Sequence, residues 1–80
     1  MDPVMQLASR HEAERHVAVG SSHIERQEQI VADRDSDGRD GAAARELLRA
    51  LRQMQDQYVA HRDRILHWLE QWAASVGDAG

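Results

Sequence analysis

Residues 44–76 read ARELLRALRQMQDQYVAHRDRILHWLEQWAASV, and this stretch decides the fold. Taken in alternating steps of four and three, it presents one row of residues that is apolar except at Gln55 and Arg62. The row consists of Ala44, Leu48, Leu51, Gln55, Tyr58, Arg62, Ile65, Leu69, Trp72 and Val76. A repeat near 3.5 residues places such side chains on one face of a long helix and suits packing against another helix. We therefore expect a helix over about 41–76 that needs a helical partner.

The N-terminal half supplies a weaker version of the same pattern. Its row, with the same spacing, is Ala13, Val17, Gly20, Ile24, Gln27 and Val31. Asp2 suits the N-cap of a helix and Pro3 suits its first position, so we expect a helix over about 3–35. Gly20 is the weakest point, because glycine costs about 1 kcal/mol against alanine in a helix interior. We expect a close approach of the two helices, or a bend, at Gly20.

The acidic segment 33–41 separates the two helices. Gly38 suits the left-handed residue after a helix end, and Asp40 suits the N-cap of the next helix. A turn at about 36–40 forces the helices to be antiparallel. The predicted fold is an all-α antiparallel two-helix hairpin, a single domain over 1–80 with a frayed tail at 77–80. The expected level pairs are Val31 with Leu48, Ile24 with Gln55, Ala13 with Ile65, and Leu7 with Trp72.

The second helix carries more apolar surface than one partner helix covers. Two further rows at heptad spacing flank its main row. They are Leu47, Met54, His61 and Trp68 on one flank, and Val59, Leu66 and Ala73 on the other. Either two hairpins pair into a homodimeric four-helix bundle, or this face binds another helical protein. The predicted interface residues are Leu47, Met54, Tyr58, Ile65, Leu66, Trp68, Leu69 and Trp72.

Composition excludes several classes of function. The chain has no cysteine, its ten basic residues are all arginine, and its formal net charge is −4, which disfavours nucleic acid and anionic membranes as partners. No apolar run approaches the length of a membrane span, and the opening Met1-Asp2-Pro3 lacks signal-peptide features, so we expect a cytoplasmic protein. We find no nucleophile with its base, no phosphate-binding loop and no paired-carboxylate cleft. We therefore expect neither enzymatic activity nor a cofactor.

Two motifs resemble metal sites and fail on their spacing. With Asp33 as position 1 of a calcium loop, position 12 is Ala44 instead of the glutamate that an EF-hand requires. His11 and His16 stand five apart, so they do not share a helix face as the zinc-peptidase pattern demands. His16 and His61 should lie nearly level across the hairpin. A weak metal site or a pH-responsive role at these two histidines stays as an alternative.

An arginine stripe offers a second alternative. Arg45, Arg49 and Arg52 lie on one side of the second helix and could contact phosphates, as in an RNA-binding hairpin dimer. The register also brings acidic residues of the first helix within reach of them, namely Glu25, Glu28 and Asp33. Ion pairs that fix the register of the helices are the interpretation that we favour.

Residues 15–66 resemble a group of short uncharacterised proteins common in soil and plant-associated bacteria. The likeness rests on a histidine-bearing first helix with Arg26-Gln27 near its middle, on an Asp-Gly-x-Asp turn at 37–40, on the Ala-x-x-Leu-Leu start at 44–48 and on His-Arg-Asp-Arg at 61–64. It departs at Gly41, where a threonine is usual. The resemblance implies a helical hairpin from the bacterial cytosol and brings no function with it.

Overall fold

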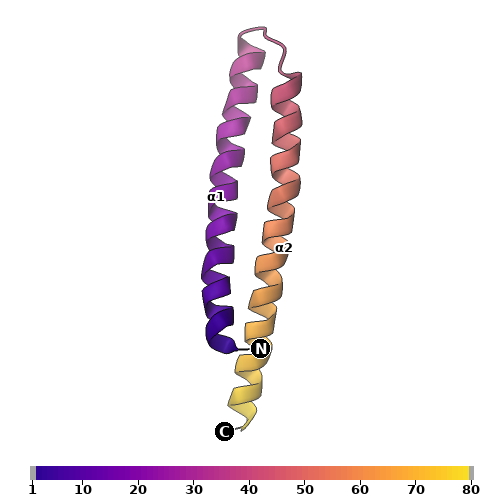
Figure 1. Ribbon diagram of the computed structural model, residues 1–80. Helices are drawn as coiled ribbons and strands as arrows, with labels where there is room; N and C mark the ends of the chain where they lie inside the picture. Colours follow the sequence, from indigo (N-terminus) through magenta and orange to yellow (C-terminus); the bar gives the residue numbers. More distant parts are fainter. Residues whose placement is uncertain (1, 80) are drawn as a thin grey trace.

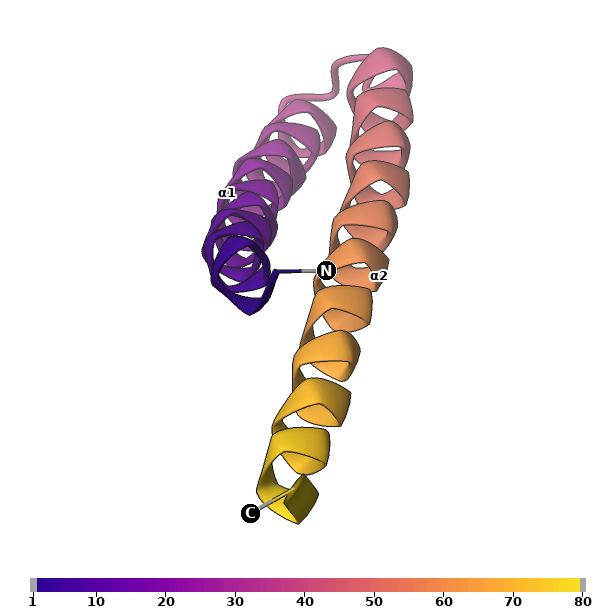
Figure 2. The same ribbon diagram turned by 60° about the horizontal axis from the view of Figure 1, so that its bottom comes forward.

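Two antiparallel helices make up the fold. The computed structural model describes residues 2–79, and the side chains of residues 2–77. Helix α1 spans Pro3–Ser36 and helix α2 spans Ala42–Ala79. They lie side by side in a rod of 65 × 15 × 14 Å, and α2 continues beyond the first turn of α1 (Figures 1 and 2). The predicted all-α hairpin is confirmed.

Side chains and backbone geometry fix three of the helix ends. The Asp2 carboxylate accepts a hydrogen bond of 3.0 Å from the Val4 N–H, and Pro3 occupies the first position of α1, as predicted. Gly38 adopts a φ of 70°, the left-handed conformation that favours glycine. The Asp40 carboxylate accepts from the N–H of Ala42 at 3.0 Å and so caps the start of α2.

The C-terminal end of α2 differs from the prediction. We expected the helix to end near Val76 with a frayed tail, whereas α2 includes Gly77 and continues to Ala79. A glycine near a helix end costs only about 1 kcal/mol and is not followed here by a proline that would stop the helix. Residue 80 of the predicted tail lies outside the described residues.

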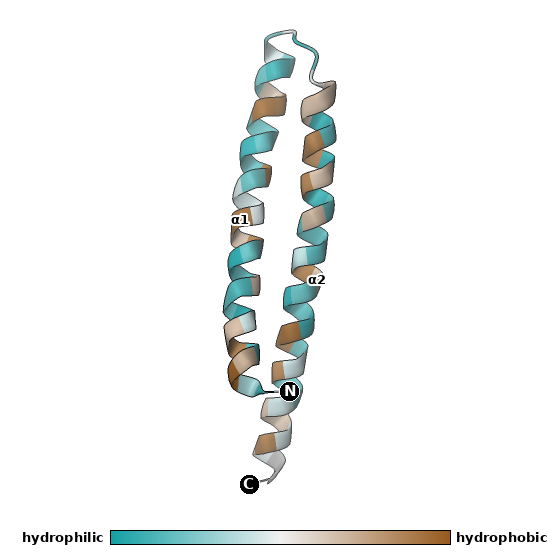
Figure 3. Ribbon diagram, in the orientation of Figure 1, coloured by the Kyte–Doolittle hydropathy of each residue, from teal (hydrophilic) through white to brown (hydrophobic). Residues whose placement is uncertain are grey.

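The interior between the helices is small. Its buried apolar residues are Ala13, Ala44, Leu48 and Ile65. Two of these are alanines, and none of the large side chains in the described part of the chain is fully buried. In Figure 3 the hydrophobic segments recur along the length of α2, while much of α1 is hydrophilic. The hairpin thus buries only part of the apolar surface that its sequence provides.

Two glutamine amides occupy positions in the interior where apolar side chains would otherwise pack. Gln27 is only 7% exposed, and its Nε2 donates to the main-chain oxygen of Ala44 at 2.9 Å. The Nε2 of Gln55 donates to the main-chain oxygen of Val17 at 2.8 Å and to the Ser21 hydroxyl at 3.1 Å. Both amides therefore join one helix to the other through their Nε2 groups, and such directed bonds between buried polar groups specify register. The Oε1 of Gln55 is buried and accepts no hydrogen bond, so this amide is only partly satisfied.

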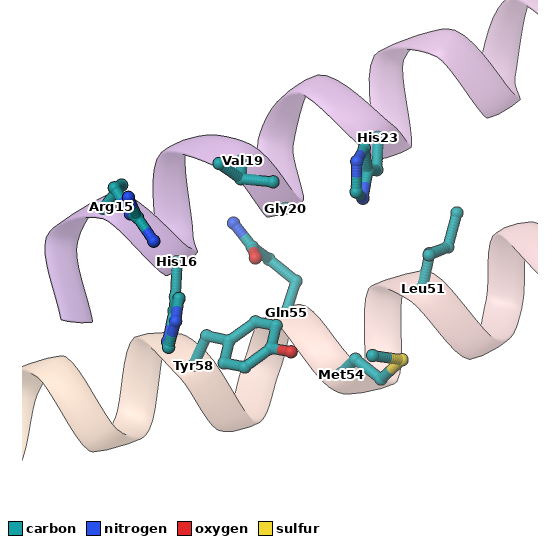
Figure 4. A pocket seen from close by; sticks show the side chains of 9 residues that line it. All are labelled: Arg15, His16, Val19, Gly20, His23, Leu51, Met54, Gln55 and Tyr58. Carbon is teal, nitrogen blue, oxygen red and sulfur yellow. The ribbon is translucent and has the colours of Figure 1, made fainter. Parts of the chain in front are cut away.

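Gly20 makes room for the Gln55 amide (Figure 4). A Cβ atom at position 20 would stand 2.0 Å from Oε1 of Gln55 and 2.9 Å from its Cδ, closer than nonbonded atoms can approach. Of the two expectations for Gly20, a close approach or a bend, the structure shows a close approach of the Gln55 side chain to the backbone of α1.

The register differs from the prediction by about one helical turn at this level. Gln55 was paired with Ile24, but it lies against Gly20 and bonds to Ser21. The connection explains the difference, since residues 39–41 are not helical and descend beside the hairpin before α2 begins (Figure 1). A residue outside a helix can advance up to about 3.3 Å, against 1.5 Å in a helix, so such a segment can displace α2 along α1.

The contact between Gly20 and Gln55 predicts that Gly20→Ala changes the free energy of unfolding in opposite directions in the wild type and in the variant Gln55→Ala. Alanine in place of a helical glycine normally stabilises by about 1 kcal/mol. Here Gly20→Ala displaces the Gln55 amide from two hydrogen bonds, so we expect the free energy of unfolding to fall by about 1 kcal/mol. In the Gln55→Ala background, Gly20→Ala should instead stabilise the protein. Urea unfolding of the four proteins at one protein concentration measures this double-mutant cycle.

Ser22→Ala is the control for that cycle, because Ser22 is exposed on α1 and should have the same effect in both backgrounds. Equal stabilisation by Gly20→Ala with and without Gln55 would show that the close approach does not exist in solution.

Candidate functional site

The candidate interaction surface is the apolar surface of α2 that α1 leaves uncovered. Among the predicted interface residues, Leu47 is 51% exposed, Met54 47% and Trp72 41%. Four others are half-buried: Tyr58, Leu66, Trp68 and Leu69. Ile65 is different, since it is only 6% exposed and belongs to the interior of the hairpin. Its place in the predicted interface is therefore corrected, because the inner face of α2 turns it towards α1.

Cross-helix ion pairs mark one side of the hairpin near the turn. Arg45 Nη1 lies 3.0 Å from a carboxylate oxygen of Asp35, and Arg52 Nη2 lies 3.9 Å from one of Glu28. Residues 45 and 52 begin the heptad row that continues through Val59, Leu66 and Ala73. We call this the charged side of the hairpin.

The opposite side is apolar and bears histidines. A hollow of about 330 Å³ opens beside Gly20, between His16, Val19 and His23 of α1 and Met54 and Tyr58 of α2 (Figure 4). Farther from the turn, a second hollow of about 330 Å³ lies beside His61 and Trp68. Met54, His61 and Trp68 share one heptad row, so both hollows open on the same side. The histidine side is defined by His16, Val19, His23, Met54, Tyr58 and His61.

A third hollow of about 360 Å³ lies where the first turns of α1 meet the last turns of α2. Leu7 lines it together with Leu66, Leu69 and Trp72. The predicted proximity of Leu7 and Trp72 is thus confirmed. This hollow extends the uncovered apolar surface to the open end of the hairpin.

The structure places His16 and His61 in different hollows. The His16 ring lies 5.4 Å from the Tyr58 ring, centre to centre, and its Nε2 is 3.9 Å from a carboxylate oxygen of Glu12. His61 instead lines the hollow with Arg64. Within the described residues, no group of three or more histidine, aspartate or glutamate side chains is arranged to hold a metal ion.

Each arginine of the predicted stripe lies beside a carboxylate. Arg52 pairs with Glu28, one of the three acidic residues of α1 predicted to lie within reach of the stripe, whereas Arg45 pairs with Asp35, which was not among them. Asp33 accepts a hydrogen bond from Gln29 within α1. Arg49 pairs with Glu46 within α2. This neutralisation fits a structural role for the stripe better than contact with phosphates.

Sequence reasoning identified the uncovered surface of α2 but missed the contribution of α1 to it. Val19 is 47% exposed beside Met54 and Tyr58, yet it belongs to neither of the rows from which the interface was predicted. Gln27 and Gln55 stood in the predicted rows as polar exceptions. Their bonds to main-chain oxygens of the opposite helix follow only once the register is known.

Comparison of the chain with protein-family models, curated proteins and solved structures finds no match. The resemblance to short bacterial hairpin proteins therefore stays an expectation. Over the described residues, neither helix has a stretch long and apolar enough to cross a bilayer.

The ion pair between Arg52 and Glu28 predicts a small, salt-sensitive coupling. Both side chains are about half exposed, so the pair should contribute about 0.5 kcal/mol at low salt. Arg52→Glu should destabilise the hairpin by placing like charges together, and Glu28→Arg added to it should restore most of the loss. Thermal or urea unfolding of the single and double variants gives the coupling energy.

A second cycle, combining Glu28→Arg with Arg49→Glu, is the control because Arg49 pairs within its own helix. Coupling of the same size in both cycles would indicate a general charge effect, and the cross-helix pair would then have no role in register.

Proposed function

We propose that this protein is a non-catalytic interaction or regulatory protein that self-associates through the apolar face of α2, as a homodimeric four-helix bundle. The observation that carries the proposal is the exposure of large apolar side chains in a hairpin whose interior is small. Leu47, Met54 and Trp72 are each more than 40% exposed, and the surface continues through half-buried Trp68 and Leu69. Aromatic anchors of this kind dominate the energetics of many interfaces.

The hairpin exposes more surface than a compact monomer of the same mass, and the excess is about what a partner of its own size would cover. Its accessible surface is 6033 Å², whereas a compact monomer of 9.1 kDa exposes about 4,900 Å². The difference of about 1,100 Å² per chain is somewhat more than the roughly 800 Å² that each partner buries in a standard interface. Pairing of two hairpins would cover an area of this size with helices packed on helices.

A second copy is the simplest occupant because the exposed apolar side chains extend along α2 from Leu47 to Trp72, so two copies can lie side by side over most of their length. Two-fold symmetry places such a face against itself and closes the assembly, which leaves no apolar surface for further growth. A different helical protein could bind the same face, and the oligomeric state distinguishes the two cases.

Met54→Glu tests the proposal. We expect it to shift the protein from dimer to monomer and to raise the dissociation constant by about a hundredfold, because an unpaired charge would be buried in the interface. Multi-angle light scattering across a dilution series measures the mass, with helicity recorded by circular dichroism on the same samples.

Gln53→Glu is the matched control, since it adds the same charge one residue away on the exposed outer face of α2. It should leave the dimer intact. A wild-type protein that is a folded monomer over the whole series would refute self-association and leave the face for another protein.

A further inference from the structure

We infer that two copies pair through their histidine sides and that protonation of the histidines there separates them. This inference rests on the proposed self-association and adds which side of the hairpin is used and what controls it. Three of the five histidines of the chain, His16, His23 and His61, line the two hollows on this side. The remaining two, His11 and His67, line neither hollow.

The two sides of the hairpin differ in their fitness for burial. On the charged side, burial of the pairs Arg45–Asp35 and Arg52–Glu28 in an interface would require desolvation of four charged groups. The histidine side presents Val19, Met54 and Tyr58 around an open hollow instead. Neither hollow on this side is lined by an acidic residue. While its histidines are neutral, this surface is largely apolar, and the charged groups that line its hollows are Arg15 and Arg64.

One arginine lines each of the two hollows together with these histidines. Arg15 lines the same hollow as His16 and His23, and Arg64 lines that of His61. Within the described residues, the one carboxylate that pairs with any of the three histidines is Glu12, 3.9 Å from His16, and its side chain is 67% exposed.

Apart from the histidines and these two arginines, the residues that line the two hollows are uncharged at neutral pH. His16 packs against the Tyr58 ring, and His61 shares its hollow with Gln6 and Ser9. In a two-fold pair, the second copy brings the same set of groups to the interface. Each protonated histidine would then face arginines and other protonated histidines with little negative charge to offset them.

The direction of the pH effect follows from burial. A neutral imidazole can enter an apolar interface, whereas an imidazolium must lose its proton or bring a charge into it. The paired state therefore binds fewer protons than the separated state, so pairing is favoured at high pH and opposed as pH falls. Histidine is the side chain whose charge ordinarily changes between about pH 5 and pH 8. The net charge of −4 acts in the opposite sense, because acidification lowers the general repulsion between copies.

Sedimentation equilibrium of the full chain at about pH 8 and about pH 5 tests the inference at constant ionic strength. We expect the dissociation constant of the wild-type dimer to rise at least about tenfold at the lower pH. In the variant His16→Gln/His23→Gln/His61→Gln the rise should be abolished. The matched control His11→Gln/His67→Gln removes the two histidines outside the hollows and should keep the wild-type response.

The outcomes separate the inference from the proposed function. A dimer with the same dissociation constant at both pH values would overturn the histidine switch and leave self-association standing, as would a full pH response in the triple variant. A wild-type monomer at about pH 8 would overturn self-association itself and the inference with it. If the triple variant does not pair at all, the single variants His61→Gln and His23→Gln decide. At least one of them must reduce the ratio of the two dissociation constants, and an unchanged ratio in both would refute the inference.

Discussion

Gln55 extends its amide across the space between the helices and donates to the Val17 main-chain oxygen at 2.8 Å. It fits there because residue 20 is a glycine, and any side chain at that position would collide with the amide. Gln27 makes a similar bond to Ala44 nearer the turn. These two contacts fix the register, and they also occupy interior positions that leucines fill in an ordinary helical pair. The hairpin gains a defined alignment at the expense of apolar burial, and the apolar side chains of α2 remain on its flanks.

Local chemistry made the helices predictable, whereas the register depends on geometry that spacing does not encode. Asp2, Pro3, Gly38 and Asp40 each have a local backbone role, and the structure places all four in it. The heptad rows likewise identified the inner face of α2. The rows look the same after a shift of one turn, and the predicted pairing of Gln55 with Ile24 did not allow for the non-helical residues 39–41. Val19 was missed because its exposure beside Met54 depends on how the two helices are rotated against each other.

The two sides of the hairpin have different roles in this proposal. The charged side contributes to the specificity of the helix register, and the histidine side contributes to the affinity between two copies. Exposed ion pairs such as Arg52–Glu28 add little stability, but a wrong register would bring like charges together. They also mark the charged side as costly to bury. The histidine side has no cross-helix ion pair in the described part of the chain, and Arg15 and Arg64 are the permanently charged residues that line its hollows, so fewer charged groups would leave water on this side. In the proposed dimer, a hairpin with one side that is unfavourable to bury would pair through the other side alone, as a closed two-fold assembly requires.

The small interior couples folding to this proposed pairing. Two helices of 34 and 38 residues bury few apolar side chains between them, namely Ala13, Ala44, Leu48 and Ile65. A chain of 80 residues with so little burial is marginal on its own, and helices of this length gain most of their stability from packing. Separation of the proposed dimer would then expose the flanks of α2 and melt part of the helices as well. The charge on three histidines per chain would therefore act on pairing and, through pairing, on the amount of folded protein. A partner that recognises the helical bundle would then respond to pH without contacting a histidine.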